Sequence, residues 1–181
     1  DGGQYQDAQR HEIKPNNGML YSSWRYCYTG IAKINAIIYQ IDKSSLNAQA
    51  KAPIYAELKS LRAYYYYMLL DMFGNVPIVT DFENLDLPEQ STRKEVYDFV
   101  ESELKESLPL LNTNVVYSKM TKNVAYALLA RLYLNSEAFI GTPRWQDCLD
   151  MCQKISGYTL APDYFTNFSQ QNQTSPEIIF A

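Results

Sequence analysis

The sequence predicts a mainly α-helical protein made of stacked antiparallel helix pairs, together with an irregular, loop-rich portion. Three observations predict this class. Apolar residues recur at three- and four-residue spacing over long segments, glycine and proline separate those segments, and one pair has the pattern of a tetratricopeptide-type repeat. The chain has 181 residues, enough for one domain with its own core, so we treat residues 1–181 as a single helical unit.

The first predicted helix follows an irregular opening. The stretch DGGQYQDAQRHEIKPNNG ends in a proline and the turn-forming pattern Asn-Asn-Gly, which predicts a loop before residue 19. A helix is then predicted from Met19 to Ile41. Its apolar stripe at helical spacing comprises Trp24, Tyr28, Ile31, Ile34 or Asn35, Ile38 and Ile41.

The second predicted helix contains RAYYYYMLLDMFGNVP, with four consecutive tyrosines from Tyr64 to Tyr67. Tyrosine can stack on a sugar ring, but it is also a large core residue. Successive helical residues turn by about 100°, so these four rings surround the helix and cannot form a flat platform. We predict that they mainly pack the core, beside a seam of Ile54, Leu58, Leu61, Tyr65, Met68, Leu69 and Met72. Gly74 and Pro77 are expected to end the helix, and VPIV to leave it as a short extended segment.

The third predicted helix begins at a capping box. Thr92 is the expected N-cap, and Glu95 stands three residues later. The apolar stripe of this helix is Val96, Val100, Leu104 and Leu108. Its charged, solvated side is Glu95, Asp98, Glu101, Lys105 and Glu106.

Residues 121–156 are predicted to form an antiparallel pair. Its first helix runs from Thr121 to Phe139 and should bury Leu128 and Leu132 between helices. Gly141 should end that helix, with Thr142 as the cap and Pro143 as the first residue of a fifth helix reaching Ile155. The inward residues of the fifth helix are expected to be Trp145, Cys148, Leu149, Cys152 and Ile155. The turn-rich tail is expected to end in an apolar strand, EIIFA.

Composition and motifs exclude several function classes. A formal net charge of −4 and a pI near 5.0 argue against a partner that is nucleic acid or an anionic membrane. Cys148 and Cys152 lack the spacing of a zinc or redox pair and are expected to be packed in the interior. Asp81, Glu83 and Asp86 lack the spacing of an EF-hand. With one histidine and no nucleophile or phosphate-loop motif, we expect no cofactor, no metal site and no enzymatic activity.

Four blocks of sequence carry a resemblance to a known family. They are YTGIAKINAII, LRAYYYYMLLDMFGNVPIV, KNVAYALLARLYLNSEAFIGTPRW and GYTLAPDYFTNFSQQNQTSPEIIFA. In this order and spacing they resemble the SusD/RagB family, which consists of surface glycan-binding lipoproteins of Bacteroidota. The resemblance implies a stack of tetratricopeptide-like helix pairs that binds oligosaccharides or polysaccharides and hands them to a SusC-type TonB-dependent transporter.

The same resemblance implies a location. It places the protein on the extracellular face of the outer membrane, touching the membrane only through a lipid anchor outside this chain. Members of the family are much longer, so we expect this chain to be an internal fragment, with the rest of the family domain outside it.

The candidate sugar site is the opening segment, because family sugar contacts vary and cannot be transferred residue by residue. Tyr5 offers a ring, Asp7 a carboxylate, and Arg10 and His11 hydrogen-bonding groups, which together suit a polyhydroxylated ligand. The alternative is an ordinary surface loop. For the whole chain, the alternatives are a tetratricopeptide-type scaffold that binds peptides, or a glycan-cleaving enzyme with paired carboxylates.

Overall fold

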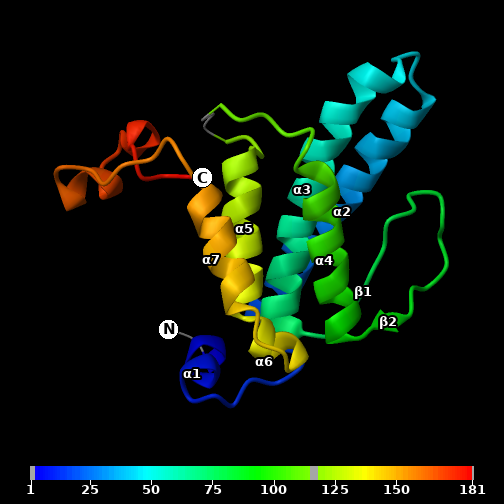
Figure 1. Ribbon diagram of the computed structural model, residues 1–181. Helices are drawn as coiled ribbons and strands as arrows, with labels where there is room; N and C mark the ends of the chain where they lie inside the picture. The colour runs from blue at the N-terminus through cyan, green and yellow to red at the C-terminus, as the bar shows by residue number, and fades with distance from the viewer. Residues whose placement is uncertain (1–2, 115–117, 181) are drawn as a thin grey trace.

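The computed structural model describes residues 3–114 and 118–180 and is mainly helical (Figure 1). The elements, in chain order, are α1 (Gly3–Gln9), α2 (Gly18–Lys43), α3 (Ala48–Phe73), β1 (Val76–Pro77), β2 (Gln90–Ser91), α4 (Arg93–Ser107), α5 (Lys122–Leu134), α6 (Ser136–Ile140), α7 (Trp145–Lys154) and the 3-10 helices η1 (Tyr164–Phe168) and η2 (Asn172–Thr174). This confirms the predicted mainly α fold.

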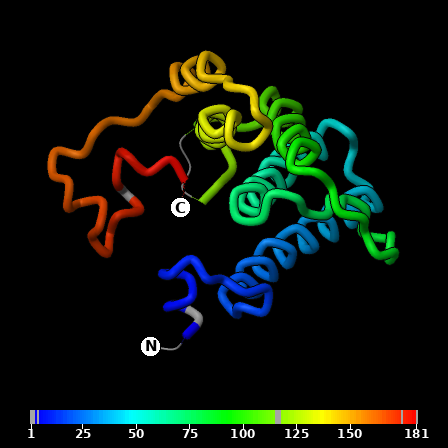
Figure 2. Tube along the Cα trace, turned by 90° about the horizontal axis from the view of Figure 1, so that it is seen from below, coloured from blue at the N-terminus to red at the C-terminus, as the bar shows by residue number. Residues whose placement is uncertain are grey.

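The helices stack in chain order. α2 packs against α3, α3 against α4, α4 against α5, and α5 against α7. Seen along the helices, α2 lies at one edge of the row, and the tail after α7 lies on the other side of the molecule (Figure 2). α2 therefore has a helix on its inner side, and its outer side faces away from the stack.

Local signals set most helix ends. The Asn17 side chain accepts the Met19 N–H and the Asn47 side chain accepts the Ala50 N–H, each at 2.9 Å. Thr92 and Glu95 form both halves of the predicted capping box. Gly74, with φ of 75°, ends α3 as predicted.

The core lies between α3, α4 and α5. Val96, Val100 and Leu104 are buried, as predicted, and so are Leu128 and Leu132. Tyr66 and Tyr67 are also buried, which confirms that these two tyrosines are packing residues.

The predicted seam of α3 was largely wrong. Ile54 and Met72 at its ends are exposed, Leu69 is buried, and the other four members are half-buried. Helix α3 is covered on two sides, by α2 and by α4. The buried residues therefore form two adjoining faces rather than one seam, and they are Ala56, Ser60, Arg62, Ala63, Tyr66, Tyr67, Leu69 and Leu70.

A buried ion pair joins three of the stacked helices. Arg62 on α3 donates two hydrogen bonds to the Glu103 carboxylate on α4, at 2.8 and 2.9 Å. It donates a third to the side-chain oxygen of Asn35 on α2, at 2.7 Å. Both charges are thus satisfied inside the stack.

The extended segment after α3 is held in place by hydrogen bonds between its backbone groups and side chains of α2 and α3. The Asn35 amide donates to the Val79 carbonyl at 2.9 Å, and the Val79 N–H donates to the Tyr66 hydroxyl at 2.7 Å. β1 pairs with β2 in an antiparallel two-stranded ladder. The loop between these strands, residues 78–89, is thereby closed at its base, and Leu85 and Leu87 near its tip are almost fully exposed.

Two predictions near the chain ends were wrong. The opening segment is not irregular throughout, since α1 forms over a short run of glutamine, alanine and aspartate that contains no proline. The expected strand at the end is absent over 177–180; Phe180 instead packs its ring against Tyr64, with 5.7 Å between centroids. Ala181 lies outside the described residues.

The fifth predicted helix also differs. α7 begins at Trp145 rather than Pro143, because the backbone of Arg144, with φ of −131° and ψ of 44°, is not helical. Arg144 is therefore the N-cap, and its side chain donates to Asp147 and Glu101. α7 lies at the end of the row and packs mainly on α5, so Trp145, Leu149 and Cys152 are exposed and only Cys148 and Ile155 are half-buried. The prediction that Cys152 is packed inside was therefore wrong.

The charged side of α4 is solvated except at one residue. Glu101 is largely covered, contrary to the prediction, because Arg144 from the start of α7 donates to it at 2.7 Å and the Tyr133 hydroxyl donates at 2.9 Å.

Candidate functional site

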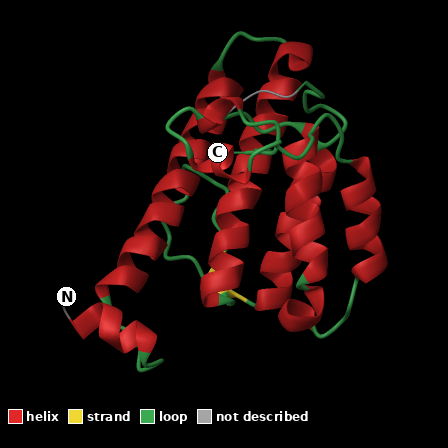
Figure 3. Cartoon of the chain, turned by 90° about the vertical axis from the view of Figure 1, so that its left-hand side faces the viewer, coloured by secondary structure: helices red, strands yellow, loops and turns green. Residues whose placement is uncertain are grey.

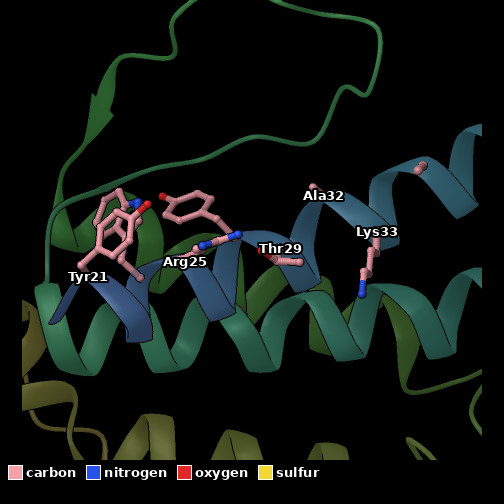
Figure 4. A pocket seen from close by; sticks show the side chains of 8 residues that line it. Tyr21, Arg25, Thr29, Ala32 and Lys33 are labelled. Carbon is pink, nitrogen blue, oxygen red and sulfur yellow. The ribbon is translucent and has the colours of Figure 1, made fainter. Parts of the chain in front are cut away.

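The outer side of α2 carries a row of exposed side chains spaced four residues apart. The row consists of Tyr21, Arg25, Thr29 and Lys33, and we call it the α2 row. Residues four apart lie on one face of a helix, so these side chains follow one another along α2 (Figure 4). They offer one aromatic ring, two cations and a hydroxyl to solvent.

Two open hollows flank the α2 row and share its four residues. The first, of about 590 Å³, is also lined by Trp24, Tyr28, Ala32 and Ala36. The second, of about 440 Å³, also contacts Ser22, Tyr26, Gly30 and Tyr65. Aromatic rings therefore stand on both sides of a line of hydrogen-bond donors.

The aromatic wall of the first hollow is fixed by packing. The rings of Trp24 and Tyr28 are 4.7 Å apart, and Phe73 packs its ring edge-to-face with Trp24 at 5.2 Å. The Tyr28 hydroxyl donates to the Pro77 carbonyl at 2.7 Å. Burial, with smaller contributions from Tyr66 and Cys27, raises the pKa of Tyr28, so this hydroxyl stays neutral. This wall is formed before any ligand arrives.

The wall of the second hollow depends on a glycine. A Cβ atom on Gly30 would lie 2.5 Å from the Cζ atom of Tyr65, so only glycine lets that ring rest on α2. Tyr65 then packs edge-to-face with Tyr26, with 5.8 Å between ring centroids. Burial and the neighbouring Tyr26 raise the pKa of Tyr65. The second of the four consecutive tyrosines thus faces a surface hollow.

The four predicted site residues lie in and after α1, and the structure does not bring them into contact. Tyr5 and Asp7 are two positions apart in the helix, which turns them roughly 200° from each other. Tyr5 is exposed and Asp7 is half-buried. Arg10 and His11 follow the helix and are exposed. In the described part of the chain, no hydrogen bond, ion pair or ring contact joins these four side chains.

The opening segment and the α2 row are neighbours all the same. α1 lies beside the N-terminal end of α2, the end at which Tyr21 stands (Figure 3). The sequence-based prediction did not include the residues of the α2 row among the candidate site residues. The sequence did carry one signal for this site. Aromatic and cationic side chains repeat every four residues on the polar side of the predicted helix.

Comparisons with known proteins agree on one family. A SusD-like family model, described as "Starch-binding associating with outer membrane", matches residues 3–134. Starch-binding protein SusD of Bacteroides thetaiotaomicron is 31% identical over 121 residues, which cover 65% of this chain and 22% of the relative. SusD-like protein P2 of Formosa agariphila is 27% identical over 96% of this chain and 35% of that protein. The chain thus spans between about a fifth and a third of the length of these relatives.

Solved structures share the fold. A laminarin-binding SusD-like protein superposes with a TM-score of 0.85 at 25% identity, over 99% of this chain and 41% of that one. A SusD superfamily protein from Bacteroides vulgatus superposes with a TM-score of 0.87 at 19% identity, over 99% of this chain and 40% of that one.

Proposed function

Because the chain belongs to the SusD-like family of starch-binding proteins that associate with the outer membrane, we propose that it is part of a surface protein that captures oligosaccharides and delivers them to a SusC-type TonB-dependent transporter. The observation that supports binding most directly is the α2 row with its two hollows. Pyranose rings have an apolar face that packs on aromatic rings, and their hydroxyls need donors and acceptors close by.

The proposed sugar surface runs from α1 along α2. Tyr21 and Tyr26 supply exposed rings, and Arg25 supplies donors between the hollows. The opening segment with Tyr5, Asp7, Arg10 and His11 extends this surface at one end. Short segments beside a rigid helix can vary in sequence while the helix holds its place, which suits a family with different glycans.

Delivery and location are the other parts of the proposal. The helical stack offers a broad, rigid face for a permanent transporter partner, with the charged side of α4 at the rim of that contact. Among the helices of the described residues, none has the length and apolarity needed to cross a membrane. We propose a lipid anchor outside this chain, at the outer surface of the outer membrane, and binding without catalysis.

The test is glycan binding by the full-length protein, measured by calorimetry against starch, laminarin and other polysaccharides. Two double variants probe the surface: Tyr5→Ala with Arg10→Ala, and Tyr21→Ala with Tyr26→Ala. Tyr164→Ala, an equally exposed tyrosine in η1, is the matched control. We expect both double variants to weaken sugar binding while the transporter still co-purifies.

Two other outcomes would redirect the proposal. Parental affinity in both double variants would place the sugar site elsewhere in the protein. Failure to bind any polysaccharide, with specific capture of a peptide by the stack, would favour the tetratricopeptide-type scaffold.

A further inference from the structure

The first part of α2 is a basic area in an acidic protein. The chain has a net charge of −4, yet residues 13–41 contain Lys14, Arg25 and Lys33 and no aspartate or glutamate. On α2 itself, every charged residue from Gly18 to Ile41 is positive. This segregation concentrates positive potential on the outer side of the helix.

The two cations of the α2 row have no anionic partner among the residues described. Elsewhere, Arg62 pairs with Glu103, Arg144 with Glu101, and Lys94 with Asp98. Arg25 and Lys33 form no such pair, and no carboxylate in the described part of the chain lines either hollow. Two exposed cations of the same row, neither of them paired with a carboxylate, leave two positions open for anionic groups beside the aromatic walls.

Asp7 and Glu12 of the opening segment precede the row in the chain, and two further acidic groups approach α2 beyond it. Glu83 accepts a hydrogen bond from the Tyr39 hydroxyl at 3.0 Å, and Asp42 is bonded to the Tyr55 hydroxyl. Tyr39 lies six residues past Lys33, about 9 Å further along the helix axis. Both carboxylates are thus engaged near the far end of α2, where they would repel an anionic ligand and confine it to the α2 row.

We propose that the α2 row selects glycans that carry negative charge, as carboxylates or sulfates on the sugar rings. This rests on the proposed glycan-binding function and names the ligand class of the same surface. The planar guanidinium of Arg25 can bind either anion through two parallel hydrogen bonds, and Lys33 supplies a second positive charge. Eight residues separate them, about 12 Å along the helix, so the two cations meet charges on different sugars of one chain.

The test compares charged and uncharged forms of the same polymer with the full-length protein. Oligogalacturonate is measured against its methyl ester, and a sulfated galactan against the desulfated galactan. Starch and laminarin provide neutral references. Arg25→Gln and Lys33→Gln remove the two charges, and Lys94→Gln on α4 makes the same change in net charge away from the row. Thermal melting confirms that each variant is folded.

We expect at least one charged polymer to bind about tenfold or more tightly than its neutral counterpart, since hydrogen bonds to charged groups are the stronger ones. That preference should fall in Arg25→Gln and Lys33→Gln, persist in Lys94→Gln, and weaken as salt is raised. Tighter binding of oligogalacturonate would show that the row prefers carboxylates, and tighter binding of the sulfated galactan would show that it prefers sulfates.

Several outcomes would overturn the inference. Equal affinity for the charged and neutral forms of each polymer would refute the proposed selection for charged glycans, while glycan binding itself would still hold. If the preference for charged polymers persists in both Arg25→Gln and Lys33→Gln, the α2 row does not cause it. Binding to none of these polymers would count against the proposed function itself as well as against this inference.

Discussion

Replacing Arg62 alone should destabilise the protein strongly. Its side chain and that of Glu103 are 6% and 7% exposed, so Arg62→Met leaves a carboxylate buried without its main partner. Removing one member of a buried pair typically costs about 3–5 kcal/mol. Lys59 Nζ lies 4.0 Å from Glu103 Oε1 and compensates part of that charge, so we expect a loss near the lower end, about 3 kcal/mol.

The assay is urea unfolding of a double-variant cycle. Arg62→Met with Glu103→Leu removes both charges, and replacing both by apolar groups is often neutral, so this double variant should regain most of the loss. Lys94→Met breaks the exposed pair with Asp98 and should cost under about 1 kcal/mol. The reasoning is refuted if Arg62→Met unfolds at the parental urea concentration, or if the double variant is no more stable than Arg62→Met.

Three further variants test packing and charge. Leu128→Ala removes a side chain that is 5% exposed and should cost about 2–5 kcal/mol; a parental urea midpoint would contradict its place in the core. Gly30→Ala should displace the Tyr65 ring and destabilise the protein by about 1–3 kcal/mol. The displaced ring should change the near-ultraviolet circular dichroism. Gly3→Ala is the control, because its Cβ meets no atom within 4 Å and it should change neither stability nor the spectrum. Burial acts to raise the pKa of Glu101, but hydrogen bonds from neighbouring side chains lower it overall. A lowered folded-state pKa gives stability that is present above the ordinary value of about 4.3 and lost as pH falls below it, so urea midpoints should drop less with acid in Glu101→Gln than in the parent.

Much of the fold could be predicted because its signals are local. The caps at Thr92 and Gly74 act within five residues, and the stripe from Val96 to Leu104 repeats with the helical period. These signals are complete within one segment of sequence. Tyr66 could be assigned to the core because the angle between helical residues excluded a flat platform.

The remainder depends on contacts between distant residues. Glu101 was predicted to be solvated because its helix position is polar, but Arg144, 43 residues later, covers it. Arg144 also occupies the N-cap position of α7 in place of the predicted Thr142. Helical spacing also gives no information on whether a neighbour covers each side of a helix, so Trp145, Leu149 and Cys152 of α7 were assigned to a core that does not cover them.

The candidate site shows the same division. Sequence reasoning favoured the opening segment because it contains suitable groups close together in the chain, and whether that segment binds sugar stays a prediction. The second of the two hollows could not be predicted, because part of its wall comes from Tyr65 on another helix. Only the space left by Gly30 allows that ring to reach α2.

The loop between β1 and β2 has a practical consequence for working with this protein. Its two ends are paired through backbone hydrogen bonds, while Leu85 and Leu87 near the tip are 93% and 96% exposed. Exposed tips on a fixed base are the sites where added residues are best tolerated. A short epitope inserted between these leucines should leave the unfolding midpoint unchanged and give antibodies access to the folded protein.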